Sequence, residues 1–174
     1  ARGEGVMELG VPGAHNLMNA LAAVAVGIEL GVPFDSIASA LAEFKGAERR
    51  FQVLGEEGGV TVIDDYGHHP TEIAAVIDAA RASNPGRVVV AFQPHRYSRT
   101  RDLLAEFGPS LAKADQIVLT EIYAASEAPI DGISGETLRA EVDRHAPGRV
   151  QLVSSLEALE EKLAAIAQPG DLVI

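Results

Sequence analysis

The chain has 174 residues, of which 47% are hydrophobic and 22% are charged, so it can form one globular domain or one domain plus part of another. Its 25 acidic and 14 basic residues give a net charge of −11, which argues against general nucleic-acid binding because phosphate backbones would repel it. It has no cysteine, which excludes disulfides and cysteine-ligated zinc, and no apolar run reaches the roughly 18 residues that a membrane span needs.

The first 46 residues have the pattern of helices. Apolar residues recur at three- and four-residue spacing over residues 17–28 and again over 37–44, which predicts two amphipathic helices. Gly31 and Pro33 separate these two helices, and Gly46 ends the second. Before the first helix, only residues 6–9 have a composition that would supply a strand.

From residue 51 onward, short β-rich runs alternate with helical segments. We expect strands over residues 60–63, 88–92, 117–120, 150–153 and 172–174. Gly108 and Pro109 predict a kink or a split in the helix that follows the second of these runs. Ser154 and Glu157 have the spacing of a capping box before the last helix. The alternation predicts an α/β fold with a Rossmann-like, mostly parallel sheet and flanking helices.

Three polar clusters stand directly after predicted strands, over residues 64–70, 93–99 and 121–127. In open α/β sheets, ligands bind outside the carboxyl ends of the strands, so these clusters predict the binding site.

One basic segment stands out in this acidic chain, because residues 79–101 contain five arginines and no Asp or Glu. Arg96 and Arg99 are three residues apart near the start of a predicted helix, so both guanidinium groups can converge on one anion. The N-terminus of that helix would add partial positive charge. The alternative is a pair of surface arginines in salt bridges.

Asp64 and Asp65 follow the first predicted strand and admit three interpretations: metal binding, contact with ribose hydroxyl groups, or simple loop structure. His68 and His69 do not favour a metal, because adjacent side chains point in different directions. A role in orienting substrate or in loop hydrogen bonding is preferred for both histidines.

Asn16 and Asn19 interrupt the otherwise apolar first helix, and their spacing places both amides on one face. Together they would suit one polar ligand. The alternative is that Asn16 caps the helix and that Asn19 is a buried amide with its hydrogen bonds satisfied.

Several long motifs together resemble the Mur ligase family. Residues 12–20, Pro-Gly-Ala-His-Asn-Leu-Met-Asn-Ala, are similar to the end of its central, ATP-binding domain, and residues 44–51 to the junction with its C-terminal domain. Residues 64–72, Asp-Asp-Tyr-Gly-His-His-Pro-Thr-Glu, and 92–100, Phe-Gln-Pro-His-Arg-Tyr-Ser-Arg-Thr, resemble the members that take L-alanine. Ser126 stands where the resemblance leads us to expect glycine.

The resemblance implies two domains: residues 1–46 as the helical end of the central domain, and residues 47–174 as a C-terminal, amino-acid-binding domain truncated at its end. It implies an ATP- and Mg²⁺-dependent bacterial cytoplasmic enzyme that joins L-alanine to UDP-N-acetylmuramate through an acyl phosphate. The roles that it implies, with no metal ligand among them, are ATP binding by Asn16, Asn19, Arg50 and Asp65, L-alanine binding by His95, Arg96 and Arg99, and a catalytic cleft lined by His68 and His69.

The chain contains no glycine-rich phosphate-binding loop ending in Gly-Lys-Thr or Gly-Lys-Ser, which the family carries. We therefore expect the missing N-terminal and central domains to be its partners, and the chain alone to be inactive. One alternative is the recycling ligase that adds a tripeptide to UDP-N-acetylmuramate. Another is a non-catalytic binding module. A dinucleotide-dependent dehydrogenase is excluded, since no Gly-x-Gly-x-x-Gly turn follows any predicted strand.

Overall fold

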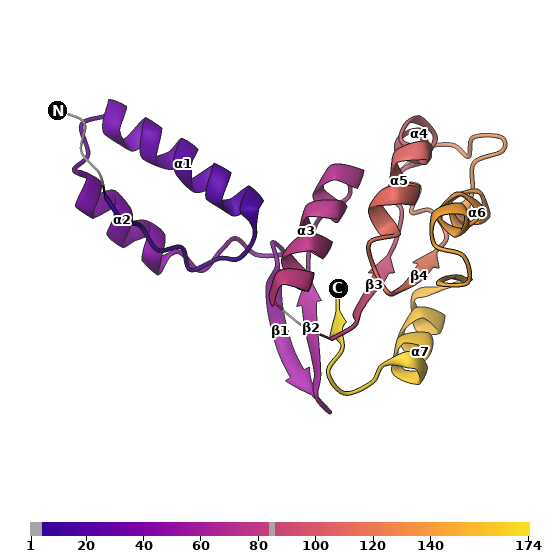
Figure 1. Ribbon diagram of the computed structural model, residues 1–174. Coiled ribbons are helices and arrows are strands. Elements are labelled where there is room, and N and C mark those ends of the chain that lie inside the picture. Colours follow the sequence, from indigo (N-terminus) through magenta and orange to yellow (C-terminus); the bar gives the residue numbers. More distant parts are fainter. Residues whose placement is uncertain (1–4, 84–85) are drawn as a thin grey trace.

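The computed structural model describes residues 5–83 and 86–174. Two helices, α1 (Ala14–Glu29) and α2 (Phe34–Glu43), pack against each other and stand apart from the sheet, touching the rest of the described chain mainly through helix α3 (Pro70–Ser83) (Figure 1). The turn between α1 and α2 contains Gly31 at φ 77°, a left-handed conformation that glycine adopts without steric cost. The two predicted helices and the break between them are confirmed.

The remaining described residues form one mixed sheet of six strands in the order β1-β2-β6-β3-β4-β5. Only the pairing of β1 with β2 is antiparallel, and the other neighbours run parallel. The strands are β1 (Gln52–Glu57), β2 (Val60–Asp64), β3 (Val88–Phe92), β4 (Gln116–Thr120), β5 (Val150–Val153) and β6 (Leu172–Val173). The predicted α/β fold with a mostly parallel sheet is therefore confirmed.

The helices that follow β2, β3 and β4 lie together on one face of the sheet, since each crossover moves in the same direction along the strand order. These are α3, the pair α4 (Tyr97–Asp102) and α5 (Leu104–Leu111), and α6 (Gly135–His145). Helix α7 (Leu156–Ile166) lies in the connection from β5 to β6, which runs back along the strand order. It therefore covers the other face of the sheet. No helix within the described residues is long and apolar enough to cross a membrane.

The hydrophobic core lies between the sheet and helices α3, α5 and α6. Strands β3 and β4 are buried almost throughout, as expected for parallel strands covered on both sides. Phe107 of α5 is 1% exposed and its ring lies 5.7 Å from that of Phe92 at the end of β3. This packing fixes the carboxyl end of β3, where one of the three predicted polar clusters begins.

Four local predictions were wrong or incomplete. Strand β1 was not predicted, because its residues are all exposed and lack an alternating pattern. Residues 6–9 form no strand. The helix after β3 is divided at Leu103, and Pro109 lies inside α5 without splitting it. Helix α7 is capped by Ser155 and not by the predicted Ser154. The Ser155 hydroxyl accepts a hydrogen bond from the backbone N–H of Ala158.

Candidate functional site

The three polar clusters meet at the carboxyl edge of the sheet, as their positions after β2, β3 and β4 predicted. Beyond the ends of β3 and β4 the two loops continue to pair, because His95 forms an isolated parallel bridge with Tyr123. The N–H of Arg96 donates to the Tyr123 carbonyl at 2.8 Å, and the N–H of Tyr123 donates to the Pro94 carbonyl at 2.8 Å. The sheet thus extends far enough to hold the loop that carries His95 and the two arginines.

A cavity of about 720 Å³ lies between the α1–α2 pair and α3, a size that suits a small-molecule ligand. Most of its lining is apolar, including Leu41, Phe44, Phe51 and Val76. All four side chains that the resemblance associates with ATP line it: Asn16, Asn19, Arg50 and Asp65. Residues almost 50 positions apart in the sequence therefore border one space with an apolar wall and a polar rim.

Neither alternative for the two asparagines holds. Asn16 does not cap α1, because the N-cap is Gly13 and the Asn16 amide instead donates to the Pro12 carbonyl at 2.6 Å. Asn19 is not a buried amide, because its side chain is exposed. Asn19 therefore has its hydrogen-bonding groups available on the cavity side of α1.

The neighbouring carboxylates Asp64 and Asp65 both support loop structure, but in different ways. Asp64 forms an ion pair with Arg49 at 3.0 Å on an exposed surface. Asp65 accepts backbone hydrogen bonds from Phe51 at 2.8 Å and Gly67 at 2.6 Å. A Cβ added at Gly67 would lie 2.8 Å from an Asp65 carboxylate oxygen, so a larger residue there would displace this carboxylate. Asp65 thus ties the start of β1 to the loop after β2 while still lining the cavity.

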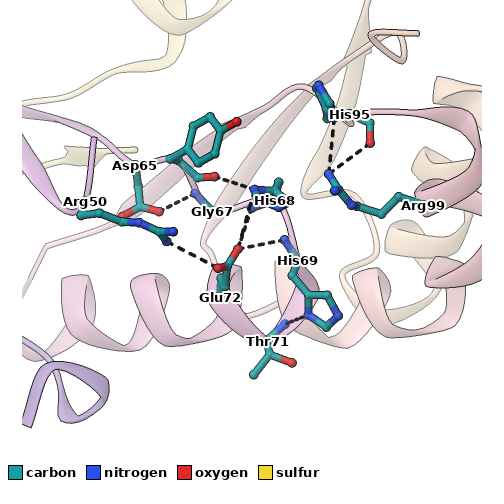
Figure 2. Close-up of polar contacts among 10 residues, drawn as sticks. Arg50, Asp65, Gly67, His68, His69, Thr71, Glu72, His95 and Arg99 are labelled. Atoms are coloured by element: carbon teal, nitrogen blue, oxygen red, sulfur yellow. Dashed lines mark hydrogen bonds and ion pairs between the residues drawn. The ribbon is translucent and has the colours of Figure 1, made fainter. Parts of the chain in front are cut away.

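His69 and Glu72 form a capping box at the start of α3 (Figure 2). The N–H of Thr71 donates to Nδ1 of His69 at 3.3 Å, and Glu72 accepts from the backbone N–H of His69 at 3.3 Å. A nitrogen that accepts a hydrogen bond carries no proton, so neutral His69 is protonated at Nε2. The Nδ1 lone pair of His69 is therefore engaged in a structural role.

His68 has the opposite arrangement. Its Nδ1 lies 3.0 Å from the carbonyl oxygen of Tyr66, which can only accept, so Nδ1 carries the proton. The Tyr66 ring packs edge-on against that of His68 with centroids 5.3 Å apart, and this contact fixes the ring orientation. Neutral His68 therefore keeps a lone pair on Nε2. The two adjacent histidines point in different directions, as the sequence suggested (Figure 2).

Glu72 connects the segment that carries His68 and His69 to Arg50, which lines the cavity. Its burial alone would raise its pKa, but hydrogen bonds from the backbone N–H groups of His68 and His69 and the charges of His68 and Arg50 hold that pKa below the ordinary value. Arg50 lies 3.5 Å from the Glu72 carboxylate, which makes this a long ion pair. Arg50 can therefore turn towards an anion in the cavity at little cost.

The replacement Glu72→Gln should lower the free energy of unfolding by about 1 kcal/mol at pH 7, since it weakens the cap of α3. Because the folded-state pKa of Glu72 is lowered, its carboxylate stabilises the protein above the ordinary value of 4.5, and this stabilisation is lost as the pH falls through the folded-state pKa. Urea unfolding as a function of pH should therefore show the two proteins converging in acid. Glu161→Gln makes the same charge change on the exposed surface of α7 and should show no such convergence.

Ion pairs distinguish the five arginines of the basic segment. Arg81 pairs with Asp115 at 3.0 Å, Arg87 with Asp171 at 2.6 Å, and Arg101 with Asp102 at 2.7 Å. Within the described part of the chain, neither Arg96 nor Arg99 has a carboxylate within salt-bridge distance. The salt-bridge alternative is thus wrong for this pair, although the charge of Arg96 does lower the pKa of Glu127 from beyond salt-bridge distance.

His95 contacts Arg99 and interacts electrostatically with Arg96 and His68. Its Nδ1 is 3.4 Å from a guanidinium nitrogen of Arg99, so the ring accepts from the arginine and neutral His95 carries its proton on Nε2 (Figure 2). Burial lowers the pKa of His95, and the nearby charges of Arg99, Arg96 and His68 lower it further, while the charge of Glu127 acts in the opposite direction. The lowered pKa favours the neutral ring of His95, which can donate from Nε2 to a substrate.

The N-terminus of helix α4 is not available to a substrate anion, contrary to the prediction. Glu127 accepts from the backbone N–H of Ser98 at 2.9 Å and from its hydroxyl at 2.6 Å. The Ser98 hydrogen bonds lower the pKa of Glu127, which keeps the carboxylate ionised. A carboxylate ligand would have to be bound by the arginine side chains, with no contribution from this helix end.

The sequence reasoning missed the roles of Glu72 and Glu127. The spacing from His69 to Glu72 matches a capping box, but a histidine is not an expected N-cap residue, so the signal was weak. Glu127 is 29 residues from Ser98, and no local pattern reports such a contact. Tyr66 and Tyr123 were likewise given no role, although each ring packs against a site histidine. Among the described residues, no group of three or more His, Cys, Asp or Glu side chains could hold a metal ion.

Comparison with known proteins finds close relatives. The chain is 51% identical over 170 residues to the UDP-N-acetylmuramate–L-alanine ligase of Desulforamulus reducens, covering 98% of this chain and 37% of that protein. It is 53% identical over 171 residues to the corresponding ligase of Geobacter sulfurreducens, again covering 98% of this chain and 37% of the relative. The chain thus spans well under half the length of these relatives.

Solved structures give the same result. The UDP-N-acetylmuramate–alanine ligase from Thermotoga maritima matches with a TM-score of 0.77 and 31% identity, covering 96% of this chain and 35% of that one. A murein peptide ligase from Psychrobacter arcticus matches with a TM-score of 0.68 and 25% identity, covering 96% and 34%. The family model described as "Mur ligase, glutamate ligase domain" matches residues 49–174. The chain belongs to the Mur ligase family.

Proposed function

We propose that this chain is the part of an ATP-dependent ligase that receives the amino acid when L-alanine is joined to UDP-N-acetylmuramate in peptidoglycan synthesis. The observation that carries the proposal is a pair of arginines without a salt-bridge partner among the described residues, Arg96 and Arg99, beside His95 at the carboxyl edge of the sheet. A guanidinium group can bind a carboxylate through two parallel hydrogen bonds, which suits the carboxylate of an amino acid. The relatives above carry the corresponding activity in their names.

In this proposal, residues 1–46 are the end of the central, ATP-binding domain and residues 47–174 are the amino-acid-binding domain. ATP would lie in the cavity between them, where the apolar wall suits adenine and the polar rim suits ribose and phosphate. Asn16 and Asn19 would contact the adenine, Asp65 the ribose, and Arg50 the phosphates. Dependence on ATP would place the reaction in the cytoplasm.

ATP would phosphorylate the lactyl carboxylate of UDP-N-acetylmuramate, and the amine of L-alanine would displace the phosphate. The amine attacks only when it has lost its proton, so the site needs a base. Of the three histidines here, His68 alone has a ring lone pair without a hydrogen-bond partner among the described residues, at Nε2. We assign proton acceptance to His68 and a structural role to His69, while His95 would donate to the alanine carboxylate.

Mg²⁺ would neutralise phosphate charge in such a reaction. We expect its protein ligands to lie outside the described residues, as the family resemblance implies. The chain by itself, which has no glycine-rich phosphate-binding loop, should release no phosphate from ATP.

The recycling ligase is the second candidate, supported by the fold match to the murein peptide ligase. Its identity to this chain is 25% with a TM-score of 0.68, against 31% and 0.77 for the UDP-N-acetylmuramate–alanine ligase from Thermotoga maritima. Phosphate release by the intact protein, measured with ATP and UDP-N-acetylmuramate, should depend on L-alanine. Dependence on the tripeptide instead would favour the recycling reaction, and release with neither acceptor, in a folded protein, would leave a binding module.

A further inference from the structure

The loop after β4 holds the loop after β3 through more than the sheet. Two backbone hydrogen bonds join Tyr123 to Pro94 and Arg96, and the Glu127 carboxylate then binds both the backbone and the hydroxyl of Ser98. Ser98 lies between the two site arginines, in the first turn of α4. The segment from 94 to 98 is therefore attached to the 123–127 loop at both of its ends.

This attachment holds the backbone of Arg96 in an unfavourable conformation. Arg96 has φ 76° and ψ 138°, in a region that side chains other than glycine rarely adopt. On the other side of the contact, Ala125 and Ser126 also have positive φ, at 47° and 71°. Conformations of this kind persist only where surrounding contacts impose them, and the Glu127–Ser98 hydrogen bonds are the strongest such contacts here because one partner is charged.

The position of Arg99 depends on the same contact. The Thr100 hydroxyl donates to the Arg96 carbonyl at 2.9 Å, and Thr100 is 1% exposed, so the first turn of α4 is packed as one unit with Arg96. Arg99 projects from that turn towards His95. If the N-terminus of α4 moved, both guanidinium groups and the Arg99–His95 contact would move with it.

We propose that Glu127 is a positioning residue for the amino-acid substrate: its carboxylate anchors Ser98 so that Arg96 and Arg99 converge on the substrate carboxylate. Glu127 is not itself expected to touch the substrate, since both of its oxygens are engaged by Ser98. The inference rests on the proposed function, because it takes the substrate to be an amino acid bound by the two arginines.

The test uses the intact ligase, with steady-state kinetics for each substrate. Glu127→Ala should raise the KM for L-alanine roughly 10- to 100-fold and leave the KM for ATP and for UDP-N-acetylmuramate unchanged, because small misplacements of binding groups have large effects. Glu127→Gln keeps one accepting oxygen and should lie between Glu127→Ala and the wild type. Ser98→Ala should have little further effect in the Glu127→Ala background, because both changes remove the same contact.

Glu136→Ala is the matched control, since it removes the same charge and two hydrogen bonds to Arg139 on the exposed surface of α6. It should change no KM. Hydrogen–deuterium exchange should also accelerate over residues 94–102 in Glu127→Ala but not in Glu136→Ala. An unchanged KM for L-alanine with Glu127→Ala, or a parallel rise in the KM of all three substrates, would overturn the proposal.

The exchange measurement needs no turnover. It therefore tests the anchoring of Ser98 by Glu127 separately from the proposed ligase function. If the wild-type protein did not require L-alanine while Glu127→Ala still loosened residues 94–102, the proposed function would fail and the anchoring contact would stand. If L-alanine were required and exchange were unchanged, the anchoring contact would fail and the proposed function would stand.

Discussion

Replacing Arg99 by alanine in the intact ligase should raise the KM for L-alanine by roughly 10²- to 10³-fold, because a charged hydrogen-bonding partner of the substrate carboxylate is removed from a partly buried site. Arg99 has no carboxylate partner among the described residues, so its charge is available to a ligand. Arg99→Lys should be intermediate, since lysine keeps the charge but loses the two-pronged geometry. Alanine-dependent phosphate release measures both effects.

Arg101→Ala is the matched control on the same helix. Its guanidinium group already pairs with Asp102 at 2.7 Å and is exposed, so the KM for L-alanine should not change. Arg96→Ala should resemble Arg99→Ala. An Arg99→Ala protein with a normal KM for L-alanine would show that the amino acid binds elsewhere.

A second readout of Arg99 requires no substrate. Burial lowers the pKa of His95, and the positive charge of Arg99 is the next largest cause. Removing that charge favours the protonated ring, so Arg99→Ala should raise the pKa of His95. An NMR titration of the His95 ring should show this rise, and no rise in Arg101→Ala.

Asp65→Ala should lower the free energy of unfolding by roughly 2–4 kcal/mol, because the backbone N–H groups of Phe51 and Gly67 both lose a charged acceptor. Phe51 packs against the main core and stands just before β1, so the effect should extend to the hairpin of β1 and β2. Asp65→Asn keeps one accepting oxygen and should lose about half as much. Urea unfolding of the chain measures all three proteins.

The adjacent residue Asp64 supplies the control. Its ion pair with Arg49 is exposed, the arginine side chain being 58% accessible, and exposed pairs contribute only about 0–1 kcal/mol. Asp64→Ala should therefore unfold near the wild-type midpoint. In the intact enzyme, Asp65→Asn should also raise the KM for ATP while Asp64→Asn does not. Equal destabilisation by the two alanine variants would contradict the assignment of Asp65 to loop structure.

The alternation of apolar strands and amphipathic helices was readable from the sequence because burial on both faces makes strands such as β3 continuously apolar. The same logic located the site, since polar clusters after parallel strands must meet at one edge. Strand β1 was missed for the converse reason: all its residues are exposed, so it carries no burial pattern.

Residue roles at the site depended on contacts between distant parts of the chain. The sequence by itself determined that five arginines lie within residues 79–101, but only the tertiary structure decided which are neutralised, because Arg87 meets Asp171 from 84 positions away. It likewise separated His68 from His69 by giving each ring nitrogen a different partner. Local sequence patterns indicate burial and spacing. The ion pairs of the arginines, the tautomers of the histidines and the directions of their side chains depend on neighbours that only folding brings together.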